Sequence, residues 1–190
     1  FKYFVDGLPK EERDDCVLIF HCAPSDNNGT DLPRVCRHLM PDYNVAFTYD
    51  INNGQPFDDK LMNLLFNSAD VYVNMASNEG FGLGSAEALT VGTPIIVNMT
   101  GGMQDQCGVT NDEGNLLTPD DYIELGSNHR GEYKTHGEWV KPVYPTSISL
   151  QGSPPTPYIW DDRCNPEDVA VNLREFYDMG REERKRLGGL

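Results

Sequence analysis

Glycines and glutamates are concentrated in the segment 77-SNEGFGLGSAE-87, the part of the sequence best suited to chemistry. Gly80, Gly82 and Gly84 remove side chains where the chain is expected to leave a strand and begin a helix. Such a turn points free N–H groups, and the positive end of the helix dipole, toward the space above the strand. These features predict a binding site for an anion such as a phosphate.

Two carboxylates bracket this turn. Glu79 precedes it, and Glu87 lies about one turn into the expected helix. Five residues of helix rise about 7.5 Å, so the two acids should reach different ends of an extended ligand. Because a carboxylate repels an anion, the pair favours a ligand with hydroxyl groups on both sides of its phosphates. A sugar, a diphosphate and a ribose in a row have this pattern.

Strands and helices alternate around this segment. Short apolar, β-branched runs predict strands, and apolar residues at helical spacing predict the helices between them. The expected strands are residues 16–22, 44–49, 71–76 and 94–98. This alternation predicts an α/β fold, a Rossmann-like parallel sheet with helices on both faces. Ligands of such sheets bind at the carboxyl ends of the strands, where the loops 77–84 and 99–103 should lie.

Capping residues predict where several helices begin and end. Thr30 or Asp31 is placed to cap a helix with an apolar stripe at Leu32, Val35, Cys36 and Leu39. Gly92 is expected to end the helix that follows the glycine turn, in a left-handed conformation. A final helix is expected over 166–179, with Asn165 as its cap and Gly180 as its stop.

Residues 103–160 break the alternation. They are rich in Gly, Pro, Ser, Asn and charged residues, and they carry the aromatics Tyr133, Trp139, Tyr144, Tyr158 and Trp160. A stretch of this length without a periodic element is unusual in a compact domain. We therefore expect a single domain over 1–190 with a long irregular insertion at about 103–160, either a cover over the site or partly mobile.

The charge balance limits the partners. With 30 acidic and 15 basic residues the net charge is −15, which opposes binding to nucleic acid or to an anionic membrane surface. The apolar runs are too short to span a membrane, so no direct membrane insertion is expected. Because the N-terminus also lacks the features of a signal peptide, we expect a cytoplasmic protein.

Cysteine and histidine give no sign of a metal site. The five cysteines are scattered without a C-x-x-C pair, which predicts reduced thiols. The four histidines show no ligand spacing, and no D-x-D pair occurs in the chain. We expect neither a metal nor another cofactor.

The glycine segment belongs to a longer pattern. The sequence 79-EGFGLGSAE-87 is followed by 87-EALTVGTPIIV-97 and by Gly101 and Gly102. This pattern resembles the signature of family-4 retaining glycosyltransferases, which have the GT-B fold of two Rossmann-like domains facing across a cleft. The order of elements before Glu79 resembles that family's second domain, and 157–188 resembles its closing helix.

The resemblance implies roles for the residues of the glycine segment. Glu79 would contact the sugar of a nucleotide-diphosphate-sugar donor and help to organise the reacting centre. The backbone at Phe81 and Gly82 would contact sugar hydroxyls. Leu83 and Gly84 would present N–H groups to the diphosphate.

The resemblance also implies roles for residues on either side of that segment. Glu87 would hold the ribose hydroxyls. Thr48 and Tyr49, at the end of the second expected strand, would lie near the nucleobase. Gly101 and Gly102 would shape the floor of the cleft.

The implied reaction is hexosyl transfer to an unknown acceptor with retention of configuration. The acceptor would attack from the face of the leaving group without a covalent enzyme intermediate, so Glu79 would act as an electrostatic and positioning group. The family's basic pair and first strand would precede Phe1, as would the acceptor-binding domain. The chain is therefore expected to be a fragment, or one chain of a split enzyme, with its N-terminal GT-B domain in the same or another chain.

Two other functions fit parts of the pattern. Gly80, Gly82 and Gly84 approach the G-x-G-x-x-G of dinucleotide-binding redox domains, but those domains need an acidic residue at the end of the next strand, where Asn98 stands. The other alternative is a non-catalytic domain that binds a nucleotide sugar as a sensor or assembly module.

Overall fold

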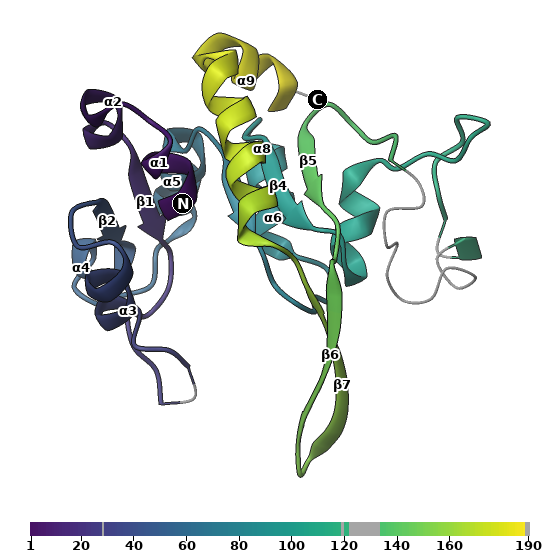
Figure 1. Cartoon of the computed structure of the whole chain (residues 1–190), viewed down its shortest axis with the longest axis horizontal. Helices are drawn as coiled ribbons and strands as arrows, with labels where there is room; N and C mark the ends of the chain where they lie inside the picture. Colours follow the sequence, from purple (N-terminus) through teal and green to yellow (C-terminus); the bar gives the residue numbers. More distant parts are fainter. Residues whose placement is uncertain (28, 119, 122–133, 189–190) are drawn as a thin grey trace. The chain divides into compact units, whose positions relative to one another are not determined.

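A computed structural model describes residues 1–27, 29–118, 120–121 and 134–188 (Figure 1). The chain divides into two compact units, Phe1–Met62 and Asn63–Leu190, and each is described by itself. The single domain expected from the sequence stays a prediction.

Unit 1 is built on a parallel pair of strands. Its elements are α1 (Lys2–Asp6), α2 (Lys10–Asp14), β1 (Val17–Phe20), α3 (Leu32–Leu39), β2 (Asn44–Phe47) and α4 (Thr48–Ile51). β1 and β2 pair from Val17 opposite Asn44 to Phe20 opposite Phe47, and the rings of Phe20 and Phe47 stack at 5.2 Å. Both strands are shorter than the sequence predicted.

The start of α3 shows which of the two expected caps is used. The carboxylate of Asp31 accepts a hydrogen bond of 3.0 Å from the backbone N–H of Arg34, and Pro33 occupies the first turn. Of the expected apolar stripe, Cys36 is buried whereas Leu39 is 50% exposed. The stripe is therefore only partly used for packing.

α5 (Asp59–Ser68) spans the boundary between the units, and the remaining elements belong to unit 2. These are β3 (Tyr72–Asn74), α6 (Leu83–Thr90), β4 (Ile95–Asn98), the 3-10 helix η1 (Gly101–Cys107), β5 (Val140–Val143), β6 (Ser147–Ser153), β7 (Thr156–Arg163), α8 (Pro166–Met179) and α9 (Arg181–Gly188). The left-handed glycine expected after α6 is confirmed, since Gly92 has φ +78°.

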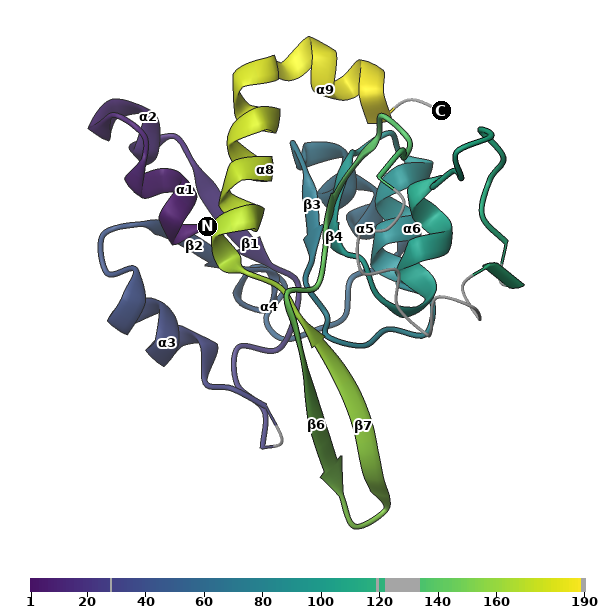
Figure 2. The same cartoon turned by 45° about the vertical axis from the view of Figure 1, so that its right-hand side comes forward.

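The core of unit 2 is a three-stranded parallel sheet in the order β3-β4-β5. All four residues of β4 are fully buried, as expected for a central strand covered on both faces. α8 lies on one face of the sheet and α6 on the other (Figure 2). The predicted α/β fold, with helices on both faces of a parallel sheet, is confirmed.

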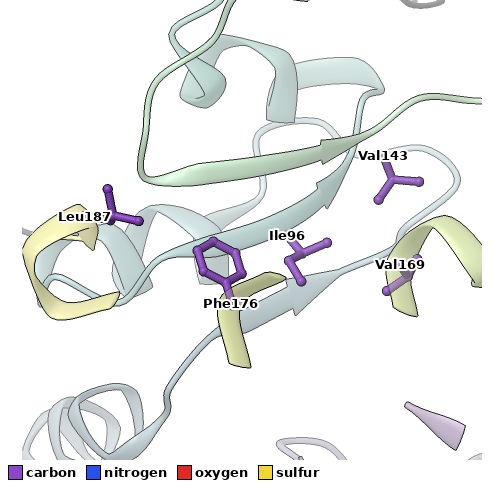
Figure 3. Packing of buried hydrophobic residues seen from close by; sticks show 5 residues of the cluster. All are labelled: Ile96, Val143, Val169, Phe176 and Leu187. Atoms are coloured by element: carbon purple, nitrogen blue, oxygen red, sulfur yellow. The ribbon is translucent and has the colours of Figure 1, made fainter. Parts of the chain in front are cut away.

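On the α8 face, side chains from β4, β5, α8 and α9 form one apolar cluster (Figure 3). Its buried members are Ile96, Val143, Val169, Phe176 and Leu187. Because side chains alternate along a strand, Ile95 and Val97 point to the opposite face, where α6 packs. The strand that leads to the second glycine loop is thus fixed from both sides.

α8 has the bounds expected from the sequence, but its predicted cap is wrong. Asn165 occupies the capping position without making a side-chain cap. Its Oδ1 instead accepts a hydrogen bond of 3.2 Å from the hydroxyl of Thr146. The helix ends at Gly180, where the backbone has φ +75°.

The segment 103–160 contains more regular structure than its composition indicated. β5 lies beside β4, and β6 and β7 form an antiparallel hairpin. The sequence did not predict β5 because Lys141 and Pro142 interrupt its apolar pattern, although Val140 and Val143 are buried. Of the aromatics noted there, Tyr133 lies outside the described residues.

Candidate functional site

The predicted glycine turn joins β3 to α6. Gly82 stands at the capping position of α6 in the left-handed region, with φ +84°, a conformation that favours glycine. Its carbonyl accepts hydrogen bonds from the N–H groups of Ser85 at 3.0 Å and Ala86 at 3.2 Å. No side chain in the described part of the chain caps this helix. Its first N–H groups therefore face outward from the helix end, as an anion site requires.

The second glycine loop packs directly against the first. The N–H of Gly102 donates a hydrogen bond of 2.9 Å to the carbonyl of Glu79. A Cβ on Gly101 would overlap that same carbonyl oxygen, and a Cβ on Gly102 would overlap the carbonyl oxygen of Gly80. Both positions need glycine because two backbones touch here.

Gln106, at the end of η1, holds the turn from the other side. Its side-chain amide donates to the carbonyl of Phe81 and, at 3.3 Å, to the carbonyl of Gly82. The backbone carbonyl of Gln106 accepts a hydrogen bond of 3.0 Å from the indole N–H of Trp139. The sequence did not single out Gln106, and only its place just after Gly101 and Gly102 hints at the contact.

Tyr72, the first residue of β3, lies near both predicted acids, Glu79 and Glu87. Its phenol ring lies over the backbone of Gly84, where a Cβ would stand 2.9 Å from the ring carbon Cζ. Burial raises the pKa of Tyr72, and the negative charges of Glu79 and Glu87 raise it further. Both carboxylates therefore lie close enough to this phenol to act on it. The sequence did not indicate a role for Tyr72 because a tyrosine in a short apolar run is typical of a strand.

The side chains around the turn differ in exposure. Glu79 is half-buried, whereas Glu87 is exposed. Leu83 is 70% exposed and Phe81 is 50% exposed, so Phe81 is not a core residue. The turn thus presents its backbone and two carboxylates to the surroundings while Gly82 itself is buried.

Thr48 and Tyr49 belong to unit 1. The expected strand ends at Phe47, and Thr48 begins the short helix α4 instead. Thr48 is buried, with its hydroxyl 2.8 Å from Nδ1 of His21, and Tyr49 is 47% exposed. Their predicted place near a nucleobase stays a prediction.

The carboxyl ends of β3 and β4 are tied to the hairpin. The side-chain amide of Asn98 donates to the carbonyls of Ala76 at 3.0 Å and Asp162 at 3.2 Å. The N–H of Asp162 donates a hydrogen bond of 2.9 Å to the carbonyl of Ser77. Asn98 is fully buried, so the position where a dinucleotide-binding domain needs an exposed acid serves a structural purpose.

The described part of the chain offers neither a cluster of metal ligands nor a membrane-spanning helix. Within the described ranges, no group of three or more His, Cys, Asp or Glu residues is placed to hold a metal ion. No helix there has the length and apolar character needed to cross a membrane.

Part of the chain is similar to known glycosyltransferases. Residues 48–126 match the family model described as glycosyl transferases group 1, and this range contains every predicted site residue from Thr48 to Gly102. A protein of Methanocaldococcus jannaschii named as an uncharacterized glycosyltransferase is 26% identical over 149 residues. The aligned part is 78% of this chain and 30% of that relative, so the chain spans less than a third of its length.

Proposed function

We propose that the carboxyl edge of the unit 2 sheet binds a nucleotide-diphosphate sugar, and that the protein transfers the sugar with retention of configuration. The observation that carries this proposal is the uncapped start of α6, which Glu79 precedes in the chain and Glu87 follows by about one helical turn. A helix start of this kind favours phosphate, and flanking carboxylates favour hydroxyl groups. The similarity to group 1 glycosyl transferases supports the same chemistry.

The diphosphate would lie at the N-terminus of α6, against the N–H groups of Leu83 and Gly84. Glu87, one turn further along the helix, would accept hydrogen bonds from the ribose hydroxyls. The carbonyls of Phe81 and Gly82 already accept from Gln106. Their N–H groups are therefore better placed than their carbonyls to meet the sugar.

Glu79 would serve the sugar and the reacting centre. Its backbone is fixed by Gly102, so its half-buried carboxylate projects from a rigid loop. In the proposed reaction the acceptor oxygen attacks the anomeric carbon from the side on which the diphosphate leaves. Fixed N–H dipoles stabilise the charge that develops on the diphosphate, and Glu79 stabilises positive charge on the sugar.

Transfer also needs an acceptor held against the anomeric carbon and water kept away. We propose that an acceptor-binding domain opposite this edge provides both. The proposed binding of the diphosphate through backbone N–H groups requires no metal ion and no other cofactor.

Calorimetry with nucleoside diphosphates on two variants tests the assignment. Glu87→Ala should weaken the binding of the matching diphosphate by about 1.5–3 kcal/mol, the value of a charged hydrogen bond. Glu79→Gln should leave that binding nearly unchanged but abolish transfer by the complete enzyme. UDP, GDP, ADP and TDP would be compared to find the base.

Glu182→Ala, an exposed acid at the start of α9, is the matched control for the loss of one negative charge. It should leave binding unchanged. If Glu79→Gln weakens the free diphosphate more than Glu87→Ala does, the roles of the two acids are reversed and the assignment fails.

A further inference from the structure

The β6–β7 hairpin carries an apolar face that the proposed sugar transfer does not use. Leu150 pairs with Trp160 across the hairpin, and Ile148, opposite the fully buried Asp162, follows on the same side by strand alternation. Tyr158 lies two residues before Trp160, next to the register shift of the hairpin. The exposed fractions of these four residues, the hairpin face, are 38% for Ile148, 50% for Leu150, 76% for Tyr158 and 56% for Trp160. In both views the hairpin extends beyond the three-stranded sheet of unit 2 (Figures 1 and 2).

The outer part of the hairpin is also uncharged, and its charged residues Asp161, Asp162 and Arg163 stand at its root. Residues 142–160 contain no Asp, Glu, Lys or Arg, in a chain that has 45 such residues (30 acidic and 15 basic) and a net charge of −15. Two copies of so acidic a protein repel each other over most of their surfaces. The hairpin face is a surface where two copies can meet without bringing like charges together.

The root of the hairpin is fixed, whereas its face is not covered. The N–H of Thr146 donates a hydrogen bond of 2.8 Å to the carbonyl of Arg163. The N–H of Asp162 donates a hydrogen bond of 2.9 Å to the carbonyl of Ser77. Among the described residues, β6 and β7 pair with each other and with no third strand. A two-stranded hairpin is only marginally stable in water, so a partner that covers its apolar face would stabilise it.

We propose that the hairpin face pairs with the same face of a second copy of this chain, in a symmetric dimer. An apolar, uncharged surface is complementary to itself, as a twofold contact requires. The aliphatic side chains of Ile148 and Leu150 stand beside Trp160, so the side chains of two such faces can interlock as they do in a protein core. Four partly exposed large side chains bury on the order of 500 Å² per copy, which places the dimer in the weak range of interfaces.

Sedimentation equilibrium measures this pairing. The mass of the chain should rise from 21.3 kDa toward twice that value with concentration. The expected dissociation constant is on the order of 10–100 µM. A chain that stays monomeric up to about 300 µM, several times the weakest value expected for such an interface, would overturn the proposal.

Two neighbouring substitutions locate the contact. Leu150→Glu places a negative charge on the hairpin face, and Gln151→Glu adds the same charge at the next residue, which points to the opposite side. Leu150→Glu should raise the dissociation constant at least tenfold, and Gln151→Glu should change it less than twofold. Equal effects of the two variants, with both folded by circular dichroism, would overturn the assignment of the face.

Tryptophan fluorescence distinguishes a second copy of the chain from a membrane as the partner of the hairpin face. The chain has two tryptophans, and Trp160→Phe leaves Trp139, whose indole is bonded to Gln106. Emission should shift to the blue with concentration in the original chain but not in Trp160→Phe. A monomeric chain whose Trp160 emission shifts only with neutral phosphatidylcholine vesicles would assign the face to a membrane instead and overturn the dimer. The outcome is independent of sugar-donor binding.

Discussion

The phenol ring of Tyr72 lies over Gly84, the second residue of α6, so closely that a Cβ on Gly84 would stand 2.9 Å from Cζ and closer still to the hydroxyl. Real Cβ atoms do not approach other atoms so closely. The sequence explained Gly84 by the approach of a phosphate. The structure adds a second reason, the packing of a strand residue onto the first turn of the helix.

Gly84→Ala separates the two reasons because alanine keeps the backbone N–H. Alanine stabilises a helix relative to glycine by up to about 1 kcal/mol. Here we expect a net loss of about 1–3 kcal/mol in the free energy of unfolding, since the added methyl group overpacks the site. In a Tyr72→Leu background the same substitution should cost less than about 0.5 kcal/mol. Urea denaturation of the four proteins measures this coupling, and an equal cost in both backgrounds would contradict the packing explanation.

Alanine substitutions at Gly102 and at Gly80 test the contact between the two glycine loops, with Gly80 as the control. A Cβ on Gly102 would overlap the carbonyl oxygen of Gly80, whereas a Cβ on Gly80 meets nothing within 4 Å. Gly102→Ala should lower the free energy of unfolding by about 2 kcal/mol or more, since one backbone must move. Gly80→Ala should change it by less than about 0.5 kcal/mol. Thermal and urea unfolding check both values, and a harmful Gly80→Ala would show that the loop is arranged differently.

Local signals explain which parts of the fold were predictable. α8 was placed correctly because Pro166, two acidic residues and Gly180 mark its ends within the sequence itself. Asn165 was assigned wrongly because its partner, Thr146, is 19 residues away. β5 was missed because its burial depends on β4 and not on its own pattern.

In the candidate site, too, residues close together in the sequence could be predicted, whereas residues brought together by folding could not. Gly80, Gly82, Glu79 and Glu87 stand close together in the chain, so their spacing could be interpreted directly. Tyr72 acts through contact with α6, and Gln106 through contact with Phe81. These contacts join elements that only the folded chain brings together.

Tyr72 should make the protein less stable at alkaline pH. Because burial raises its pKa in the folded state, the unfolded chain loses the phenol proton first as pH rises past about 10. The contribution of Tyr72 is thus fully present below its ordinary pKa and is lost as pH rises toward the raised value. Tyr144, whose pKa is raised to about 12 by burial, should act in the same direction.

Urea midpoints between pH 9 and 11.5 test this expectation. Tyr72→Phe should show a smaller loss of stability over that range than the original chain. Tyr158→Phe, a substitution at a side chain that is 76% exposed, is the control and should follow the original chain. An unchanged pH profile in Tyr72→Phe would mean that the phenol is more solvated than its packing over Gly84 indicates.

Sugar-donor binding should survive chelation. In the proposed site, the charge of the diphosphate is balanced by N–H groups at the start of α6, and these do not depend on a metal ion. Calorimetry of the nucleoside diphosphate that binds best should therefore give the same affinity, within about twofold, with and without excess EDTA, since no charged contact is removed. Mg²⁺ or Mn²⁺ added in excess over the chelator should have no further effect. If affinity falls in EDTA and returns with either ion, a cation shares the diphosphate with α6, and Glu79 or Glu87 would have to be reconsidered as its ligand.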